Sequence, residues 1–173
     1  MEFLKIVGLC VLAAVFYGIV HDQFTVRVCL QYFTVFHPPI FGGTQSPTLL
    51  ALGWGVFATW WVGAILGIFL AIAARSGSRP SLSARELLPM IRNLLLAMGG
   101  CAFLSGSAGY FWGEVPPYMA AVLPPGAYHR FAADWAAHSA SYASGFLGGI
   151  ALCVLAYRKR KLSSLPSPAK AAS

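Results

Sequence analysis

Four long runs of apolar residues, separated by shorter polar connections, organise the chain. The runs cover about residues 3–20, 47–74, 90–112 and 134–157. A bilayer span needs about 20 apolar residues in an α-helix, so each run is long enough to cross the hydrocarbon core. The pattern predicts an all-α integral membrane four-helix bundle, with residues 1–161 forming a single transmembrane domain.

The first run also has the length and flanking charge of a secretory signal peptide, because Lys5 stands near its start. A signal peptide ends in a small-x-small cleavage site, whereas the residues here read Tyr-Gly-Ile-Val and lead directly into His21. We therefore expect the run to be retained as the first helix, with a cleaved signal peptide as the alternative.

Two polar connections are expected to cover one end of the bundle. Residues 25–36 are rich in β-branched and aromatic side chains and partly alternate, which favours a short strand or an interfacial segment. The sequence His37-Pro-Pro then breaks regular structure. In the second connection, two Pro-Pro pairs bracket a short apolar segment, which indicates a surface turn or a short helix. Residues 21–46 and 113–133 together predict an irregular or short β outer cap.

Local signals also place two boundaries at the other end. Ser83 and Glu86 have the spacing of a capping box, so we expect the third helix to begin near Ala84. Residues 162–173 offer little to bury, and we expect a disordered tail there.

Small residues recur at helical spacing in the second and fourth runs. Their glycines are Gly55, Gly63 and Gly67 in one run, and Gly145 and Gly149 in the other. Such rows let two helix backbones approach closely in a membrane. We expect them to be packing faces, within the protein, in a homo-oligomer or against a membrane-protein partner.

Charge is scarce and unevenly placed. Of the 173 residues, 58% are hydrophobic and 10% charged, with a mean hydropathy of +0.69, whereas soluble domains carry about 25% charged residues. The net charge of +7 comes largely from four arginines within residues 75–92 and a basic run at 158–161. Clusters of this kind flank the cytoplasmic ends of spans. They predict that both termini are cytoplasmic and argue against nucleic-acid binding.

Several classes of membrane protein lack their required residues here. The four cysteines include no CxxC, and only Cys29 lies in a polar connection, so a disulfide framework, a zinc ribbon or a four-helix thiol oxidase is not expected. No span has the mid-depth carboxylate of a small multidrug exporter, and no polar lining indicates a channel.

The predicted topology gathers ionisable residues on the outward side. All four histidines lie there, as do three of the five acidic residues. His21 and Asp22 are expected to end the first helix. Asp134, His138 and Tyr142 follow at intervals of four residues, which places them on one helical face. If the first and fourth helices are neighbours, these groups converge.

Histidine and carboxylate side chains are the usual ligands of zinc and related divalent ions, and they also serve proton transfer. The candidate metal ligands are His21, Asp22, His37, Asp134 and His138. Tyr17 and Tyr142, one turn deeper, are candidates to fix the histidine tautomers. A structural polar network, in which Asp134 pairs with His138 or Arg130, is the competing interpretation. A haem between His21 and His138 is a further alternative.

The segment from His21 to His37 reads HDQFTVRVCLQYFTVFH. It resembles a segment of small four-helix bacterial inner-membrane proteins to which no function is assigned. The resemblance implies a multi-pass protein of the bacterial inner membrane and gives no residue a role.

The sequence thus predicts a small polytopic inner-membrane protein whose outward His/Asp site binds a divalent metal ion or a small polar ligand. One alternative is a non-catalytic scaffold or subunit that acts through its glycine-rich faces. Another is a membrane-embedded, metal-dependent hydrolase or transferase.

Overall fold

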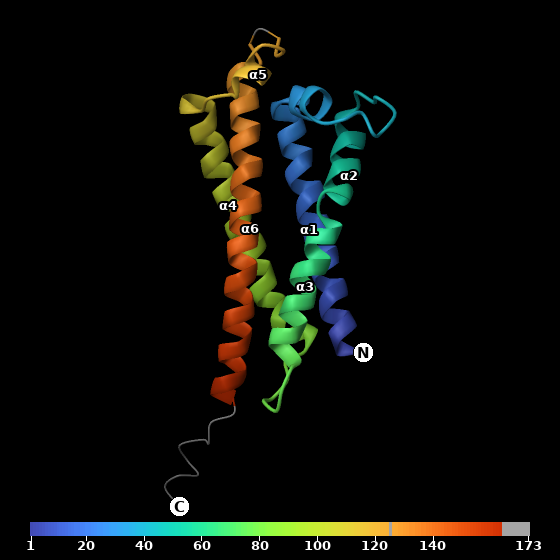
Figure 1. Ribbon diagram of the computed structural model, residues 1–173, viewed down its shortest axis with the longest axis vertical. Helices are drawn as coiled ribbons and strands as arrows, with labels where there is room; N and C mark the ends of the chain where they lie inside the picture. The colour runs from blue at the N-terminus through green and yellow to red at the C-terminus, as the bar shows by residue number, and fades with distance from the viewer. Residues whose placement is uncertain (125, 164–173) are drawn as a thin grey trace, which may run out of the picture.

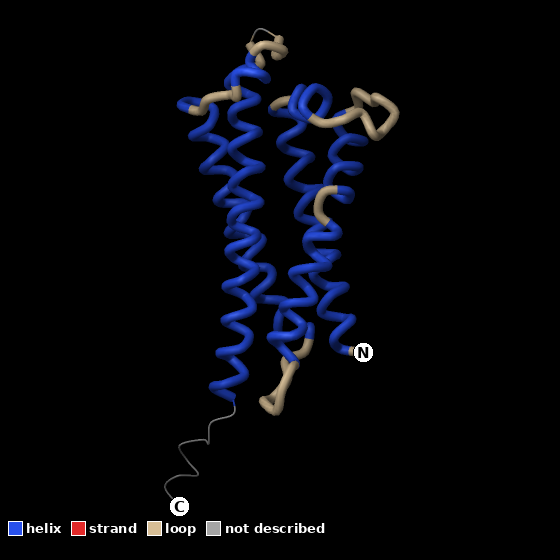
Figure 2. The backbone as a smooth tube through the Cα atoms, viewed as in Figure 1, coloured by secondary structure: helices blue, strands red, loops and turns tan. Residues whose placement is uncertain are grey.

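The computed structural model describes residues 1–124 and 126–163, and every regular element in them is helical (Figures 1 and 2). The elements are α1 (Glu2–Val28), a π-helical turn η1 (Tyr32–Phe36), α2 (Pro47–Phe57), α3 (Trp60–Arg75), α4 (Ala84–Trp112), α5 (Pro117–Ala120) and α6 (Tyr128–Ser163). The predicted all-α class is confirmed.

Four helical stretches are long and apolar enough to cross a membrane. They are α1, the α2–α3 stretch Pro47–Arg75, α4 and α6. Large apolar side chains cover their outward surfaces, for example Leu12, Phe103 and Leu147, which are 69%, 74% and 65% exposed. Such a surface suits lipid, since soluble proteins rarely expose large contiguous apolar patches.

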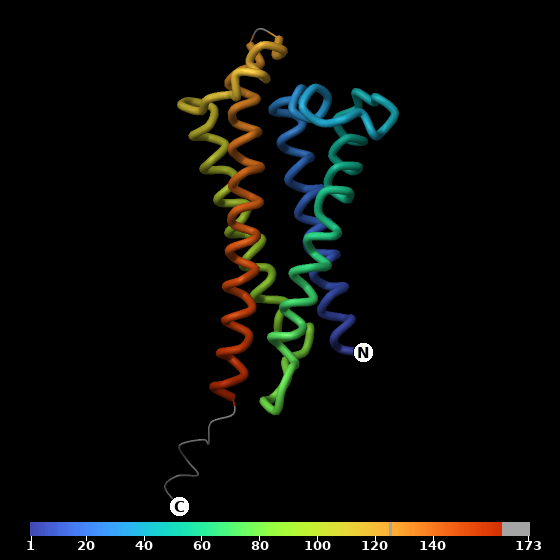
Figure 3. The backbone as a smooth tube through the Cα atoms, in the orientation of Figure 1, coloured from blue at the N-terminus to red at the C-terminus, as the bar shows by residue number. Residues whose placement is uncertain are grey.

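The helices associate as two groups (Figure 3). α4 lies along α6, while α1 packs against α2 and α3. The two groups meet mainly where α3 contacts α6 and α1 contacts α4. Met1 and the last turn of α6 lie at the same end of the bundle. We call this the arginine end, and the opposite end, with η1, α5 and the start of α6, the His end.

The first helix is longer than its apolar run. α1 continues to Val28, so His21 and Asp22 lie inside the helix rather than at its end. The expected short strand within residues 25–36 is wrong, because this segment forms the end of α1 and η1. A lone strand has no partner for its backbone groups, whereas a helix satisfies them within the segment. The cap over the His end is therefore helical and irregular.

The second span is broken where α2 ends and α3 begins. The amide of Ala58 donates to the carbonyl of Trp54, but the amide of Thr59 donates to Val56, one residue nearer than in an α-helix. The Thr59 hydroxyl donates to the Gly55 carbonyl at 2.5 Å. Back-bonding of a threonine hydroxyl in this way bends helices.

Glycines allow α1 to touch the second span backbone to backbone. A Cβ built at Gly18 would lie 2.6 Å from the Gly55 carbonyl oxygen, and one built at Gly63 would lie 2.7 Å from that of Cys10. Gly67 faces the same side of α1. Gly145 and Gly149 of α6 instead meet side chains, those of Met98 and Leu66.

The arginine end is closed by one buried side chain. Arg160 is 1% exposed, and its guanidinium donates to four backbone carbonyls, those of Ala73, Ser76, Arg79 and Pro80, at 2.7–3.1 Å. These carbonyls belong to the last turn of α3 and the loop after it. Arg160 thus caps α3 from α6.

The boundaries predicted for α4 and α5 are present. The capping box forms, with the Ser83 hydroxyl accepting from the Glu86 amide and the Glu86 carboxylate accepting from the Ser83 amide. α5 is the short helix expected between the Pro-Pro pairs. Of the tail predicted to be disordered, residues 162 and 163 continue α6, and residues 164–173 lie outside the described residues.

Candidate metal centre

His138 is the centre of a buried polar cluster at the His end. The residue is 7% exposed, and its ring lies between two carboxylates from different helices. Nε2 is 3.3 Å from Oδ1 of Asp22 on α1, and Nδ1 is 3.2 Å from Oδ1 of Asp134, one turn earlier on α6. Asp22 and Asp134 are themselves 6% and 1% exposed. Helices α1 and α6 therefore bring together the groups that their sequences carry separately.

The hydrogen bonding of the ring indicates which nitrogen is free. Nδ1 lies 2.9 Å from the backbone carbonyl oxygen of Asp134. A carbonyl oxygen only accepts, so Nδ1 carries a proton. When the ring is neutral, Nε2 therefore has no proton and presents a lone pair. That lone pair faces the Asp22 carboxylate, which is also an acceptor. Such a pair is stable only when a proton or a cation lies between the two atoms.

His21 completes a group of three candidate ligands. One ligand atom each from His21, Asp22 and His138 lie within 4.8 Å of one another. The His21 ring contacts the edge of the His138 ring at a centroid distance of 4.6 Å. Its Nε2 is buried and has no hydrogen-bond partner within the described residues. His21 and Asp22 are adjacent in a continuous helix, so their side chains leave α1 in different directions. Both still contact His138, His21 through its ring and Asp22 through its carboxylate.

Asp134 lies behind His138 rather than in the ligand group. Its carboxylate oxygens are buried and make no hydrogen bond within the described residues, although Oδ1 is within ion-pair distance of Nδ1. Arg130 bonds the Gly126 carbonyl instead, so the alternative Arg130–Asp134 pair does not form. A carboxylate on the far ring nitrogen of a histidine fixes the ring and strengthens it as a metal ligand.

His37 lies in an aromatic layer above the cluster and outside the ligand group. Its Nδ1 donates to the Tyr32 carbonyl at 2.8 Å, and its ring packs on Trp54 at a centroid distance of 4.5 Å. Burial lowers the pKa of His37 below its ordinary value. Neutral His37 therefore belongs to this packed aromatic layer.

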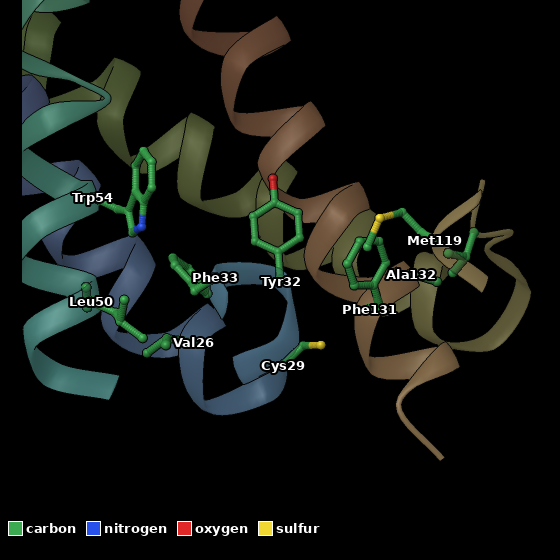
Figure 4. Packing of buried hydrophobic residues seen from close by; sticks show 11 residues of the cluster. Val26, Cys29, Tyr32, Phe33, Leu50, Trp54, Met119, Phe131 and Ala132 are labelled. Carbon is green, nitrogen blue, oxygen red and sulfur yellow. The ribbon is translucent and has the colours of Figure 1, made fainter. Parts of the chain in front are cut away.

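Tyr32 is the residue of the aromatic layer that contacts the His/Asp cluster directly. Its ring stacks on His138 with a centroid distance of 4.4 Å and an interplanar angle of 26°. Figure 4 shows a cluster of buried apolar residues in which Tyr32 lies between Phe33 and Phe131, with Trp54 on the α2 side. These rings exclude water from the side of the His/Asp cluster that they cover, which strengthens electrostatic interactions inside the cluster.

The two supporting tyrosines behave differently from expectation. The Tyr17 ring stacks on His21 at 5.7 Å, while its hydroxyl pairs with Ser141 at 2.8 Å. Tyr142 is 54% exposed and lines the cavity described below. Neither hydroxyl is hydrogen-bonded to a histidine within the described residues. The outer residues His129 and Glu114 are exposed and lie apart from the cluster.

A cavity of about 900 Å³ opens below the cluster, between the two helix groups. Helices α1, α3, α4 and α6 line it, almost entirely with apolar side chains. Its polar groups gather at the His end, and they are Tyr17, His21, Asp22, Thr59, His138, Ser141 and Tyr142. The His/Asp cluster is thus the polar end of a long apolar space.

The four central residues were predicted from the sequence, whereas their surroundings were not. Tyr32, Thr59 and Ser141 were not expected at the site. Ser141 had a usable signal, because it lies three residues after His138 and hence on the same helical face. The haem alternative does not fit, because the rings of His21 and His138 touch edge to face, whereas two axial ligands lie on opposite sides of a porphyrin.

The chain matches no family model, no curated protein and no solved structure. The chemistry of the His/Asp cluster is therefore the basis for assigning a function.

Proposed function

We propose that this protein binds a divalent transition-metal ion, such as zinc, inside a membrane-spanning bundle. His21, Asp22 and His138 are the ligands, and Asp134 orients His138 from behind. Two imidazoles and one carboxylate are a ligand set that zinc commonly takes.

The observation that carries the proposal is the contact between Nε2 of His138 and Oδ1 of Asp22 at 3.3 Å. With the ring proton on Nδ1, both atoms are acceptors, and the neighbouring Nε2 of His21 has no partner within the described residues. A buried cluster of this kind is costly unless a proton or a cation lies between its atoms, and the unpartnered Nε2 of His21 beside the pair favours a cation. A single divalent ion satisfies all three residues.

Three protein ligands leave one coordination position open. Structural zinc sites usually have four protein ligands, whereas sites that act on a bound molecule keep a position free. The cavity below the cluster gives this position somewhere to face. The arrangement therefore supports a metal that meets a ligand or substrate, more than a metal that only holds the fold.

The bacterial inner membrane, with both termini cytoplasmic, is the location we propose. The arginine end carries the basic residues of the 75–92 connection and the 158–161 run, while the polar connections at the His end carry one arginine each, Arg27 and Arg130. Fusion of alkaline phosphatase or green fluorescent protein after residue 163 tests this. Fluorescence without phosphatase activity is expected, and the opposite result would reverse the topology.

Metal content of the purified protein tests the function. Chelated protein in mild detergent is titrated with Co²⁺, followed by its visible spectrum, and zinc is measured by mass spectrometry after dialysis. We expect one ion per chain in the wild type. His21→Ala, Asp22→Asn and His138→Ala should each weaken binding by about tenfold or more, since each removes a ligand.

His129→Ala is the matched control, because His129 is an exposed histidine on the same end of α6. It should bind metal as the wild type does. Equal metal binding by all four variants would reject the site. A metal-free wild type that co-purifies with a stoichiometric membrane protein would favour the scaffold alternative.

A further inference from the structure

The cavity below the His/Asp cluster has a polar end and an apolar remainder, which matches the two parts of an amphiphilic molecule. Its polar lining is confined to the His end, and the remaining lining comes from apolar side chains of four helices. Leu152 and Val154 of α6 mark its far extent on that helix. From His138 to Leu152 the rise along α6 is about 21 Å, which accommodates an extended hydrocarbon chain. Small-molecule pockets commonly measure about 300–1,000 Å³.

The charge of the proposed metal centre selects the head group. His21 and His138 bind as neutral imidazoles, and Asp22 contributes one negative charge, so a divalent ion and its three ligands carry a net charge of +1. The Asp134 carboxylate, on the far side of the His138 ring, offsets part of this charge from outside the ligand group, so the remaining attraction for an anion acts at the ion's open position. An anionic oxygen group at the open position neutralises the ion in a region of low dielectric.

We infer that the cavity binds a single-chain amphiphile whose anionic oxygen head, a carboxylate or a phosphate, coordinates the metal at the His21–Asp22–His138 site. This inference rests on the proposed function, because the head group binds through the metal. The chain extends toward the arginine end between α3 and α6, past Leu66.

Leu66 offers a way to block the chain without touching the metal. It lines the cavity from α3 and lies against Gly149 of α6, well below the cluster. Leu66→Trp should fill the space that the chain occupies. Ile68→Trp is the matched control, because Ile68 is two residues away on the same helix, 42% exposed, and outside the cavity lining.

The experiment uses full-length Co²⁺-loaded protein in detergent and follows the visible spectrum of the ion. Palmitate and lysophosphatidate are the amphiphile probes, and acetate and inorganic phosphate are the matching heads without a chain. In the wild type all four should change the spectrum. Leu66→Trp should weaken the response to the amphiphiles by about tenfold or more, as expected for loss of several buried methylenes, and leave the short anions unchanged. Ile68→Trp should change neither.

The outcomes separate the two proposals. If Co²⁺ binds and Leu66→Trp affects palmitate and acetate alike, the metal site survives and the amphiphile inference is rejected. The amphiphile inference is also rejected if hexadecanol, which has a neutral head, competes as well as palmitate, since the cavity then only takes up lipid chains. If the wild type binds no Co²⁺, both proposals fail. A stronger response to one amphiphile identifies the head as carboxylate or phosphate.

Leu66→Trp is valid as a test only if it folds, so its Co²⁺ affinity and thermal stability are measured first. Met98→Trp, which fills the same cavity from α4, is the second blocking variant. A normal amphiphile response in a folded Met98→Trp and a folded Leu66→Trp would overturn the inference.

Discussion

The two ends of the bundle both bury charged side chains, and they treat them in opposite ways. At the arginine end, Arg160 donates to four carbonyls and is 1% exposed. At the His end, Asp134 is equally buried, yet its carboxylate makes no hydrogen bond within the described residues, and Nε2 of His21 also lacks a partner. Burial alone therefore does not distinguish a structural polar residue from a candidate ligand.

The difference lies in whether the surrounding chain satisfies the buried group. Arg160 meets groups that need donors, because the carbonyls at the end of α3 have no partner in their own helix. The His/Asp cluster instead holds two carboxylates and two imidazoles that need a proton or a cation between them. Keeping such a cluster away from water costs stability unless a proton or a bound cation completes it.

The largest expected effect is at the arginine end. Arg160→Ala leaves the carbonyls of Ala73, Ser76, Arg79 and Pro80 without their donor, and we expect a loss of about 3 kcal/mol in the free energy of unfolding. Thermal denaturation in detergent measures it. Arg158→Ala, an exposed arginine in the same basic run, should change stability little. Equal effects of the two variants would mean that the carbonyl contacts of Arg160 carry no stability.

A substitution at the His end should affect stability only when metal is present. Zinc at about a hundredfold excess over its dissociation constant should stabilise the wild type by about 2.7 kcal/mol, and Asp22→Asn should lose most of this gain. Without metal, Asp22→Asn should be as stable as the wild type or more so, because asparagine removes a buried charge and its amide group donates to the Nε2 lone pair of His138. A large loss in the metal-free protein would instead make Asp22 structural, like Arg160.

Asp134→Asn tests the residue that most resembles Arg160 in burial. Asparagine keeps the shape but weakens the contact with Nδ1 of His138, so metal affinity should fall about tenfold to a hundredfold without being lost. A Co²⁺ titration measures the change. Glu114→Gln, an exposed acidic residue at the same end, is the control. Unchanged affinity in Asp134→Asn would remove this carboxylate from the metal centre.

The smallest expected effect is the pH dependence contributed by His37. Burial lowers the pKa of His37 in the folded protein, while in the unfolded chain it is about 6.5. The neutral ring therefore adds stability above about pH 6.5, and this is lost as the pH falls below it. In metal-free protein, His37→Gln should flatten the fall in melting temperature between about pH 7 and pH 5 relative to His129→Gln. Parallel curves for the two variants would contradict the prediction.

Much of the architecture could be predicted because lipid imposes simple rules. Four apolar runs predicted four helices, and the basic clusters separated the chain into two ends. Because His21, Asp22, Asp134 and His138 all fell near one end of their runs, their convergence required only that α1 and α6 meet. The sequence could not show that α1 continues to Val28, since β-branched and aromatic residues also fit a packed helix.

The role of Arg160 could not be predicted from the basic run that contains it. Four consecutive cations suggest a solvated flank, so nothing in the charge pattern singles out one of them. The helical period does, because Arg160 continues the buried face that includes Gly145, Gly149, Leu152 and Ala156. The aromatic layer above the His/Asp cluster was not predicted, for a different reason. The contact of Tyr32 with His138 depends on the path of an irregular turn, which no short-range spacing encodes.

Helix α6 carries both ends on one rod. Twenty-two residues separate His138 from Arg160, which is about 33 Å of α-helix, close to the thickness of the hydrocarbon core of about 30 Å. The two polar regions are thus held about one bilayer thickness apart, the spacing expected if each lies at a lipid interface. In a thinner bilayer both cannot stay at their interfaces unless the bundle tilts. The spacing of polar residues on α6 therefore suits a bilayer whose hydrocarbon core is about 30 Å thick.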